Sequence, residues 1–144
     1  MTKTFFTPEE QQEIVQAIAR AELNTSGEIR VHMEAYCHRS VLHHATKVFH
    51  RLEMHKTVKR NGVLFYVAVK SRKVAIVGDE GIHQHVKQEF WDNLAKEIVS
   101  CFAQNKYKEG LIIGIERAGE KLKVHFPRED DDVNELPDEI SFGN

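Results

Sequence analysis

The sequence predicts an α/β protein, built as a three-layer α/β/α sandwich around a small mixed sheet. Three short segments have strand patterns, and about four to five segments carry apolar residues at helical spacing. Strand and helix patterns alternate along much of the chain, an order typical of a sheet covered by helices on both faces. A chain of 144 residues is long enough to bury the core of one such domain.

The first helix is predicted to begin at Thr7. Its hydroxyl can cap the helix, Pro8 suits the first helical position, and Glu10 completes a capping box. Apolar residues then recur at positions 14, 17, 18 and 21, and the Asn-Thr-Ser-Gly sequence of residues 24–27 ends the helix. One face of this helix should therefore pack on the rest of the domain.

Residues 28–35 alternate between polar and apolar side chains, which predicts a half-buried strand. Its polar face carries Glu28, Arg30, His32 and Glu34. Two explanations stay open for so many charged and polar groups: this face is partly open to solvent, or its charges pair with one another.

Two further strands are predicted at residues 63–69 and 74–77. The first of these is a nearly continuous apolar run, typical of a central strand buried on both faces. A helix beginning near Ser40 separates it from the strand at 28–35, so these two strands should be parallel with a right-handed crossover. The short polar link at 70–73 makes the last two strands an antiparallel hairpin.

The second half of the chain is predicted to be helical. A short turn at 82–87 precedes an amphipathic helix at about 90–102, and a last long helix ends before Pro127. We therefore expect a single α/β domain over residues 1–127. Residues 128–144 begin with the acidic run at 129–132 and are expected to form a tail that is partly docked or disordered.

Composition excludes some classes of function. The formal net charge of −2 and the absence of a basic stripe argue against a nucleic-acid partner. No apolar run of about 18 residues could span a membrane. The N-terminus lacks the apolar region of a secretory signal, so we expect a cytoplasmic protein. Two distant cysteines, Cys37 and Cys101, are typical of small buried thiols rather than of a disulfide framework.

Polar residues gather at one edge of the predicted sheet, which we call the rim: Glu28, Arg60, Asn61, Asp79 and Glu80. The hairpin returns Asp79 to the end where Asn61 enters the sheet, and the parallel strand starting at Glu28 begins at that same end. Carboxylate and amide oxygens are the ligands that Ca²⁺ or Mg²⁺ prefers. The rim therefore suggests a metal site formed by Asp79, Glu80, Glu28 and Asn61. The alternative is that Asp79 only caps the following helix within a Gly-Asp-Glu-Gly turn.

Five of the nine histidines lie between residues 38 and 55. The His-Glu-x-x-His spacing of a helical zinc site is absent, and Lys47 would repel a cation, so a solvated polar helix face is the better interpretation. The helix face from His43 to Arg51 and the acidic tail are both possible contact surfaces for a protein partner.

Five short motifs occur in an order that resembles the TPM domain family. They are Ser26–Val31, Arg60–Leu64, Val74–Gly81, Phe90-Trp91 and Gly110-Leu111. This family is also called TPM phosphatase, and its better-known members are thylakoid-lumen and photosystem-repair proteins. Residues 134–140 resemble the end of its short soluble bacterial members. The resemblance implies an α/β/α sandwich, divalent-cation binding, calcium in particular, and the acid phosphatase activity assigned to some members.

Three functional hypotheses follow, and all stay open at the level of sequence. The first is a calcium-binding domain with Asp79, Glu80, Glu28 and Asn61 as ligands. The second is a metal-dependent phosphatase in which Arg60 clamps the phosphoryl group of a phosphate ester. Its catalytic residues are unknown apart from the candidates Asp79 and Arg60, because no nucleophile motif is present. The third is a non-catalytic module that binds a protein partner.

Overall fold

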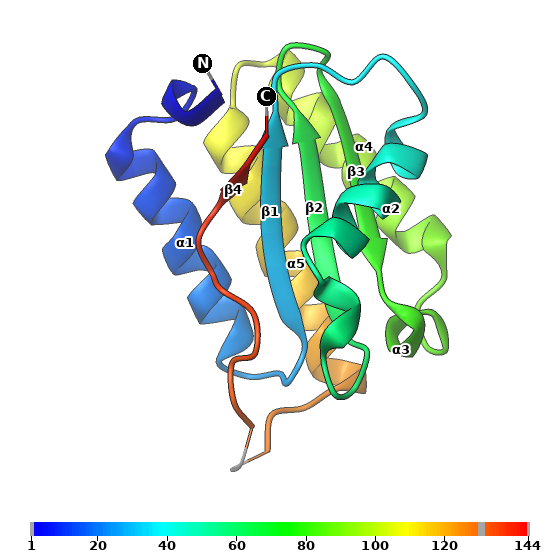
Figure 1. The fold of residues 1–144 in the computed structure, drawn as a ribbon. Coiled ribbons are helices and arrows are strands. Elements are labelled where there is room, and N and C mark those ends of the chain that lie inside the picture. The colour runs from blue at the N-terminus through cyan, green and yellow to red at the C-terminus, as the bar shows by residue number, and fades with distance from the viewer. Residues whose placement is uncertain (1, 130–131, 144) are drawn as a thin grey trace.

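The computed structural model describes residues 2–129 and 132–143. Within them a mixed sheet has the strand order β3-β2-β1-β4 (Figure 1). The strands are β1 (Glu28–Glu34), β2 (Gly62–Ala68), β3 (Lys73–Gly78) and β4 (Ser141–Phe142). β1 and β2 are parallel and β2 and β3 antiparallel, which confirms the predicted topology. β4 adds a parallel strand beside β1 that the sequence pattern did not predict.

Helices cover both faces of the sheet, so the predicted three-layer sandwich is confirmed (Figure 1). α1 (Pro8–Glu22), α4 (Gln88–Ala103) and α5 (Tyr107–His125) pack on one face, and α2 (Val41–Arg51) packs on the other. Three short turns complete the described elements: η1 (Thr2–Thr4), η2 (Met54–Lys56) and α3 (Glu80–His83). No helix in the described ranges is both long and apolar enough to cross a membrane.

The apolar core lies in two layers. The larger layer fills the space between the sheet and α1, α4 and α5, with Phe65 and Trp91 fully buried in it. The smaller layer joins α2 to the sheet through Phe49 and Tyr66. Burial of each such large apolar side chain contributes about 1.5–3 kcal/mol relative to its exposure. β2 is buried along its whole length because it lies between β1 and β3, as its continuous apolar run predicted.

Local sequence signals set the helix starts. The Thr7 hydroxyl accepts a hydrogen bond from the Glu10 amide at 3.1 Å, and the Glu10 carboxylate accepts one from the Thr7 amide at 3.0 Å. This is the predicted capping box, and it satisfies two backbone donors. α3 begins at Glu80 rather than at Ile82, because the Asp79 carboxylate accepts a hydrogen bond from the Glu80 amide. Both cysteines are free thiols, and Cys37 is buried while Cys101 is half-buried.

The C-terminal segment, residues 132–143, runs back along the edge of β1 (Figure 1). The amides of Glu135 and Leu136 donate to the Glu28 carboxylate, and the Gly143 amide donates to the Met33 carbonyl at 2.8 Å. Of the two explanations for the polar face of β1, mutual pairing holds for His32 and Glu34, whose side chains lie 3.0 Å apart, whereas the Glu28 carboxylate is bound to backbone amides. Glu28, His32 and Glu34 are buried and hydrogen-bonded.

Candidate functional site at the rim of the sheet

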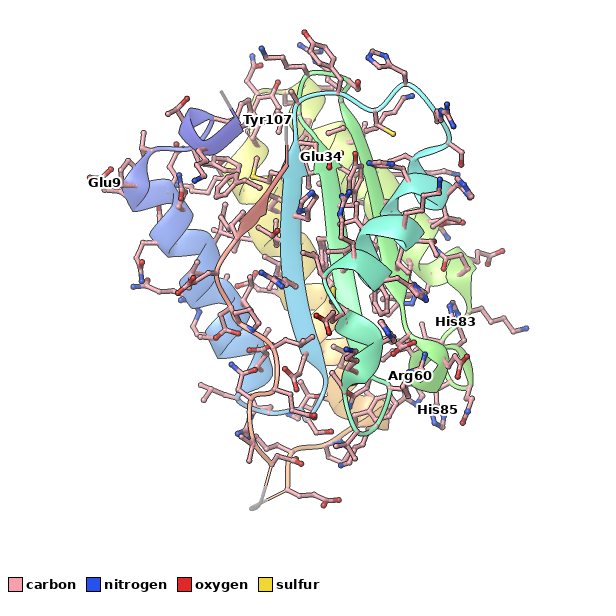
Figure 2. The ribbon with its side chains drawn as sticks, in the orientation of Figure 1. Glu9, Glu34, Arg60, His83, His85 and Tyr107 are labelled. Carbon is pink, nitrogen blue, oxygen red and sulfur yellow. The ribbon has the colours of Figure 1, made fainter. Side chains whose placement is uncertain are left out.

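The structure brings the five predicted rim residues to one end of the sheet. The Glu28 amide donates to the Asn61 carbonyl at 3.2 Å, and the Asp79 amide donates to the Gly62 carbonyl at 3.0 Å. Figure 2 shows Arg60 at this end, beside α3 and far from Glu34 at the other end of β1. Antiparallel pairing of β2 with β3 and parallel pairing of β1 with β2 produce this arrangement.

Arg60 and Asp79 form a bidentate ion pair. Nε of Arg60 donates to Asp79 Oδ2 at 2.8 Å, and Nη2 donates to Oδ1 at 2.9 Å. Two parallel N–H···O bonds of this kind fix orientation as well as charge. The Asp79 side chain is only 5% exposed, so both of its oxygens are engaged inside the protein. The remaining nitrogen of Arg60, Nη1, lies 3.4 Å from the exposed Glu80 carboxylate.

Backbone geometry holds this ion pair in place. Arg60 has a left-handed conformation with φ of 51°, which costs free energy in a residue with a side chain. Its carbonyl accepts a hydrogen bond from the Gly81 amide at 2.9 Å, which compensates for part of that cost. A Cβ at position 81 would lie 2.4 Å from the Lys59 carbonyl oxygen, so only glycine permits this approach. The glycine after Asp79-Glu80 is therefore required by packing.

Glu28 and Asn61 have other partners. The Glu28 carboxylate accepts hydrogen bonds from two amides of the C-terminal segment, those of Glu135 and Leu136. The Asn61 side chain is buried and donates to the Ser26 hydroxyl at 3.3 Å. The Glu28 contacts link the start of β1 to the returning C-terminal segment.

The four predicted ligands therefore do not form a ready cation site. Asp79 is neutralised by Arg60 and caps α3, and Glu28 is bound to backbone amides. Across residues 2–129 and 132–143, no group of three or more His, Cys, Asp or Glu side chains is arranged to hold a metal ion. For Asp79, the cap that the sequence offered as the alternative is present in the structure.

A hollow beside these residues has more suitable chemistry. It has a volume of about 380 Å³, and its walls are Ser26, Val58, Lys59, Asn61, Glu129, Asp132, Val133 and Glu135. Three of these residues carry carboxylates, and Ser26 and Asn61 add neutral oxygens. Among these wall residues the cation is Lys59, whose Nζ lies 3.8 Å from Asp132 Oδ1. Sequence reasoning treated the acidic tail separately from the rim, and only the return of the chain along β1 brings the two together.

Buried acids near this end of β1 have raised pKa values. Burial, aided by a hydrogen bond with Asp138, raises the pKa of Glu22 to about 9. Burial also raises the pKa of Glu28 to about 7, although its two amide donors oppose the rise. Glu22 lies on α1, and its carboxylate accepts a hydrogen bond from the Ile29 amide at 2.9 Å. In the sequence, Glu22 is an ordinary polar residue near the end of the first helix, and its pattern gave no indication that it would be a buried acid.

A second polar cluster lies at the opposite end of β1, around Glu34. The Glu34 carboxylate accepts a hydrogen bond from the Tyr66 hydroxyl, and Nε2 atoms of His32 and His44 each lie 3.0 Å from its oxygens. Burial favours the neutral acid, but these hydrogen bonds outweigh it and hold the pKa of Glu34 below its usual value. Burial lowers the pKa of His32 and raises that of the Tyr66 hydroxyl.

The sequence contained one indication of this second cluster. His32 and Glu34 alternate on the polar face of the first strand, and that face also carries Glu28 and Arg30. Tyr66 stands within an apolar run and His44 within a polar helix face, so neither residue pointed to Glu34. The cluster forms because β1 and β2 pair in register, with His32 opposite Tyr66.

Family comparison identifies the fold that carries these clusters. The family model described as the TPM domain matches residues 2–121, which is most of the chain. The chain belongs to the TPM domain family. The matched residues include all five rim residues and the Glu34 cluster except Ser141, whose hydroxyl lies 2.9 Å from His32 Nδ1.

Solved structures show the same fold. The NMR structure of the BA42 protein from the psychrophilic bacterium Bizionia argentinensis is 48% identical, covers 96% of both chains and has a TM-score of 0.88. The N-terminal domain of a P. gingivalis protein is 15% identical, with a TM-score of 0.68 over 86% of this chain and 82% of its own. The N-terminal domain of a Corynebacterium glutamicum protein is 12% identical, with a TM-score of 0.63 over 83% of this chain and 75% of its own. A comparison with curated proteins gave no match.

The BA42 match extends past the family model in this TPM domain. Coverage of 96% of this chain requires that most of the C-terminal segment has a counterpart in BA42. Part of the segment that lines the rim hollow is therefore shared by the two proteins.

Proposed function

We propose that this TPM domain binds a divalent cation at the rim, with Ca²⁺ as the expected ion and Mg²⁺ as the alternative. The observation that carries the proposal is the hollow whose walls include Ser26, Asn61 and the acidic residues Glu129, Asp132 and Glu135. These three acids are not arranged to hold an ion among the described residues, so a bound ion would have to draw them together. Carboxylate, amide and hydroxyl oxygens suit Ca²⁺, which accepts six to eight oxygen ligands in irregular geometry. Membership of the TPM family supports the same class of ligand.

The proposed ligand set differs from the one that the sequence suggested. Asn61 remains, because it lines the hollow. Glu80 does not line the hollow, and its carboxylate lies 3.4 Å from Arg60 Nη1. Glu28 and Asp79 are not ligands in this set. Glu28 holds the C-terminal segment in position, and Asp79 holds Arg60. A bound cation would replace Lys59 as the partner of Asp132. This competition predicts weak affinity, since the cation must displace an existing charge partner.

A calcium titration followed by amide chemical shifts tests the proposal. We expect shifts in residues 58–61 together with residues 129–135, and a rise in the melting temperature through mass action. Asp132→Asn should weaken binding about tenfold or more, because calcium affinity depends on the number of charged ligands. Asp92→Asn, on the exposed surface of α4, is the matched control and should leave the affinity unchanged.

Other outcomes of the titration have equally definite meanings. Shifts confined to 129–135, with residues 58–61 unaffected, would show a loosely bound ion on the acidic segment and would remove the rim from the site. Shifts at residues 28, 61 and 79–80 without any at 129–135 would restore the original ligand set and would contradict the revised one. Equal weakening by Asp132→Asn and Asp92→Asn would indicate general charge attraction only.

Phosphate-ester hydrolysis at the same rim is a second candidate function. The observation that favours it is Arg60, whose side chain is 39% exposed and whose guanidinium is held in a fixed orientation by Asp79. An arginine held in this way can present a nitrogen to a phosphoryl oxygen, and a metal-activated water would have to act as nucleophile. This candidate requires turnover of a phosphate ester that chelation abolishes and that Arg60→Gln reduces strongly. Turnover that survives both changes would exclude the mechanism.

A further inference from the structure

A hollow at the other end of the sheet has the opposite charge character. Its volume is about 480 Å³, within the range of small-molecule sites. Its walls are Glu34 at the end of β1, the four residues Tyr36–Arg39 that follow, and His43, His44 and Lys47 on α2. None of these residues belongs to the rim, and Figure 2 shows Glu34 and Arg60 toward opposite ends of the sheet.

The walls of this hollow are predominantly basic. Arg39 and Lys47 are exposed cations, and three histidines stand beside them. The acid in the wall, Glu34, is already compensated by hydrogen bonds from Tyr66 and His44 and by Arg51, whose Nη2 lies 3.7 Å away. Its charge therefore does little to offset the positive potential of the hollow.

Neighbouring lysines add to this potential. Lys73 Nζ donates to the Cys37 carbonyl at 3.0 Å, and Lys70 Nζ lies 5.7 Å from the centre of the Tyr36 ring. The hollow also lies where a parallel strand ends and α2, a helix of 11 residues, begins. The start of a helix carries partial positive charge, and ligands of α/β proteins commonly bind beyond the carboxyl ends of parallel strands.

An aromatic surface completes the site. The Tyr36 side chain belongs to a residue that is 53% exposed, and its ring stacks on His38 with 5.6 Å between centroids. An exposed pair of flat rings beside cationic groups suits a ligand with an anionic group on an apolar or aromatic body.

Metal binding is a poorer explanation of the same residues. No group of three or more His, Cys, Asp or Glu side chains in the described ranges is arranged to hold an ion. The Cys37 thiol is directed to the Arg39 carbonyl, 3.5 Å away. The cations of Arg39 and Lys47 would also oppose a bound metal.

We propose that the hollow formed by Tyr36–Arg39 and the first half of α2 binds a small organic oxyanion, a carboxylate or phosphate monoester on a compact apolar or aromatic body. Arg39 and Lys47 supply the charge that attracts the oxyanion, and Tyr36 supplies the apolar contact. The site is independent of the rim and requires no divalent cation.

Amide chemical-shift titrations of the whole chain, in the presence of a chelator, test this site. The probes are phenyl phosphate, benzoate and inorganic phosphate, with benzyl alcohol as the neutral control. We expect shifts from phenyl phosphate or benzoate to cluster at residues 36–47, and the stronger of the two identifies the oxyanion. Weaker binding of inorganic phosphate would show that the apolar body contributes.

Exposed side chains provide variants that keep the fold. Arg39→Gln and Lys47→Gln should each weaken binding about tenfold, as expected for loss of a charge-assisted hydrogen bond. Lys96→Gln, an equally exposed lysine on α4 at the opposite face of the sheet, should leave binding unchanged. Three results would overturn the proposal: equal binding of benzyl alcohol, equal weakening by Lys96→Gln, or no shift at 36–47 up to about 10 mM probe.

Discussion

β1 begins and ends with a buried glutamate, and the two have opposite electrostatics. Glu28 is 2% exposed and its pKa is raised to about 7, whereas Glu34 is 8% exposed and its pKa is lowered. Burial raises the pKa of both acids, so burial alone does not explain the difference. At Glu28, burial outweighs the two backbone amide donors and nearby carboxylates add to the rise, whereas at Glu34 hydrogen bonds from Tyr66, His32 and His44 outweigh burial.

The comparison shows that one strand supports two kinds of environment. At the end where β1 starts, the carboxylates of Glu129, Asp132 and Glu135 line the rim hollow, and the chemistry suits a cation. At the end where β1 stops, the acid is compensated and basic side chains remain, so the chemistry suits an anion. The two ends of the sheet therefore carry the two proposed sites.

The largest expected effect comes from Glu34→Gln. The side-chain nitrogen of the new glutamine would lie against hydrogen-bond donors that now bind a carboxylate. We therefore expect the free energy of unfolding at pH 7 to fall by about 2–4 kcal/mol. Because the pKa of Glu34 is lower in the folded state than its unfolded value of 4.5, the ionised carboxylate stabilises the fold above pH 4.5. This stabilisation is lost as the pH falls through the folded-state pKa. The difference between wild type and variant should therefore shrink below pH 4.5 in denaturant unfolding. A difference that is constant from pH 3 to pH 7 would contradict an ionised Glu34.

An effect of opposite sign is expected for Glu22→Gln. The pKa of Glu22 is raised from 4.5 to about 9, so its contribution to stability is complete below pH 4.5 and is lost as pH rises toward 9. Glutamine can still accept from the Ile29 amide and can donate to Asp138. We expect the variant to be more stable than wild type at pH 8 by about 2 kcal/mol, as measured by denaturant unfolding.

Glu120→Gln on the exposed face of α5 is the control for that measurement and should leave the pH dependence unchanged. If Glu22→Gln destabilises the protein equally at pH 5 and pH 8, the carboxyl is ionised in the folded state. Glu28 would then be the remaining acid with a raised pKa to contrast with Glu34 at the other end of β1.

The smallest of the three effects concerns Gly143, which closes the Glu34 end of the strand. A Cβ at this position would lie 2.5 Å from Glu34 Oε2 and 2.7 Å from its Cγ. Gly143→Ala should cost about 1 kcal/mol, because Glu34 is fixed by its partners and cannot easily move aside. Hydrogen exchange at the Gly143 amide, which donates to Met33, should become faster. Unchanged protection there would show that the segment adapts without loss of its pairing.

Much of the fold could be predicted because its signals are local. The capping box at Thr7, the alternation of β1 and the apolar run of β2 each lie within a few consecutive residues. β4 could not be predicted in this way. It has two residues and pairs with a strand about 109 positions earlier, and such a short segment carries no periodicity of its own.

The rim was predictable in position but not in its contacts. Strand order and the hairpin placed Arg60, Asn61 and Asp79 at one edge. Hydrogen bonds from distant segments decide which carboxylates have a protein partner. Arg60 donates to the Asp79 carboxylate, and the amides of Glu135 and Leu136 donate to the Glu28 carboxylate. These choices depend on side-chain geometry in three dimensions, which sequence spacing does not specify.

By itself the sequence determined the class of the fold, the pairing of the three main strands and the residues that meet at the rim. Periodicity, capping and turn residues act over short distances along the chain, and the pairing rules for strands then limit the topology to one arrangement. Tertiary structure alone decided that the C-terminal segment returns along β1, that it brings carboxylates to Asn61, and that Glu34 is compensated while Arg39 and Lys47 remain exposed. The physical reason is that burial and hydrogen bonding between distant segments set the charge of each group, and neither can be read from neighbours in sequence.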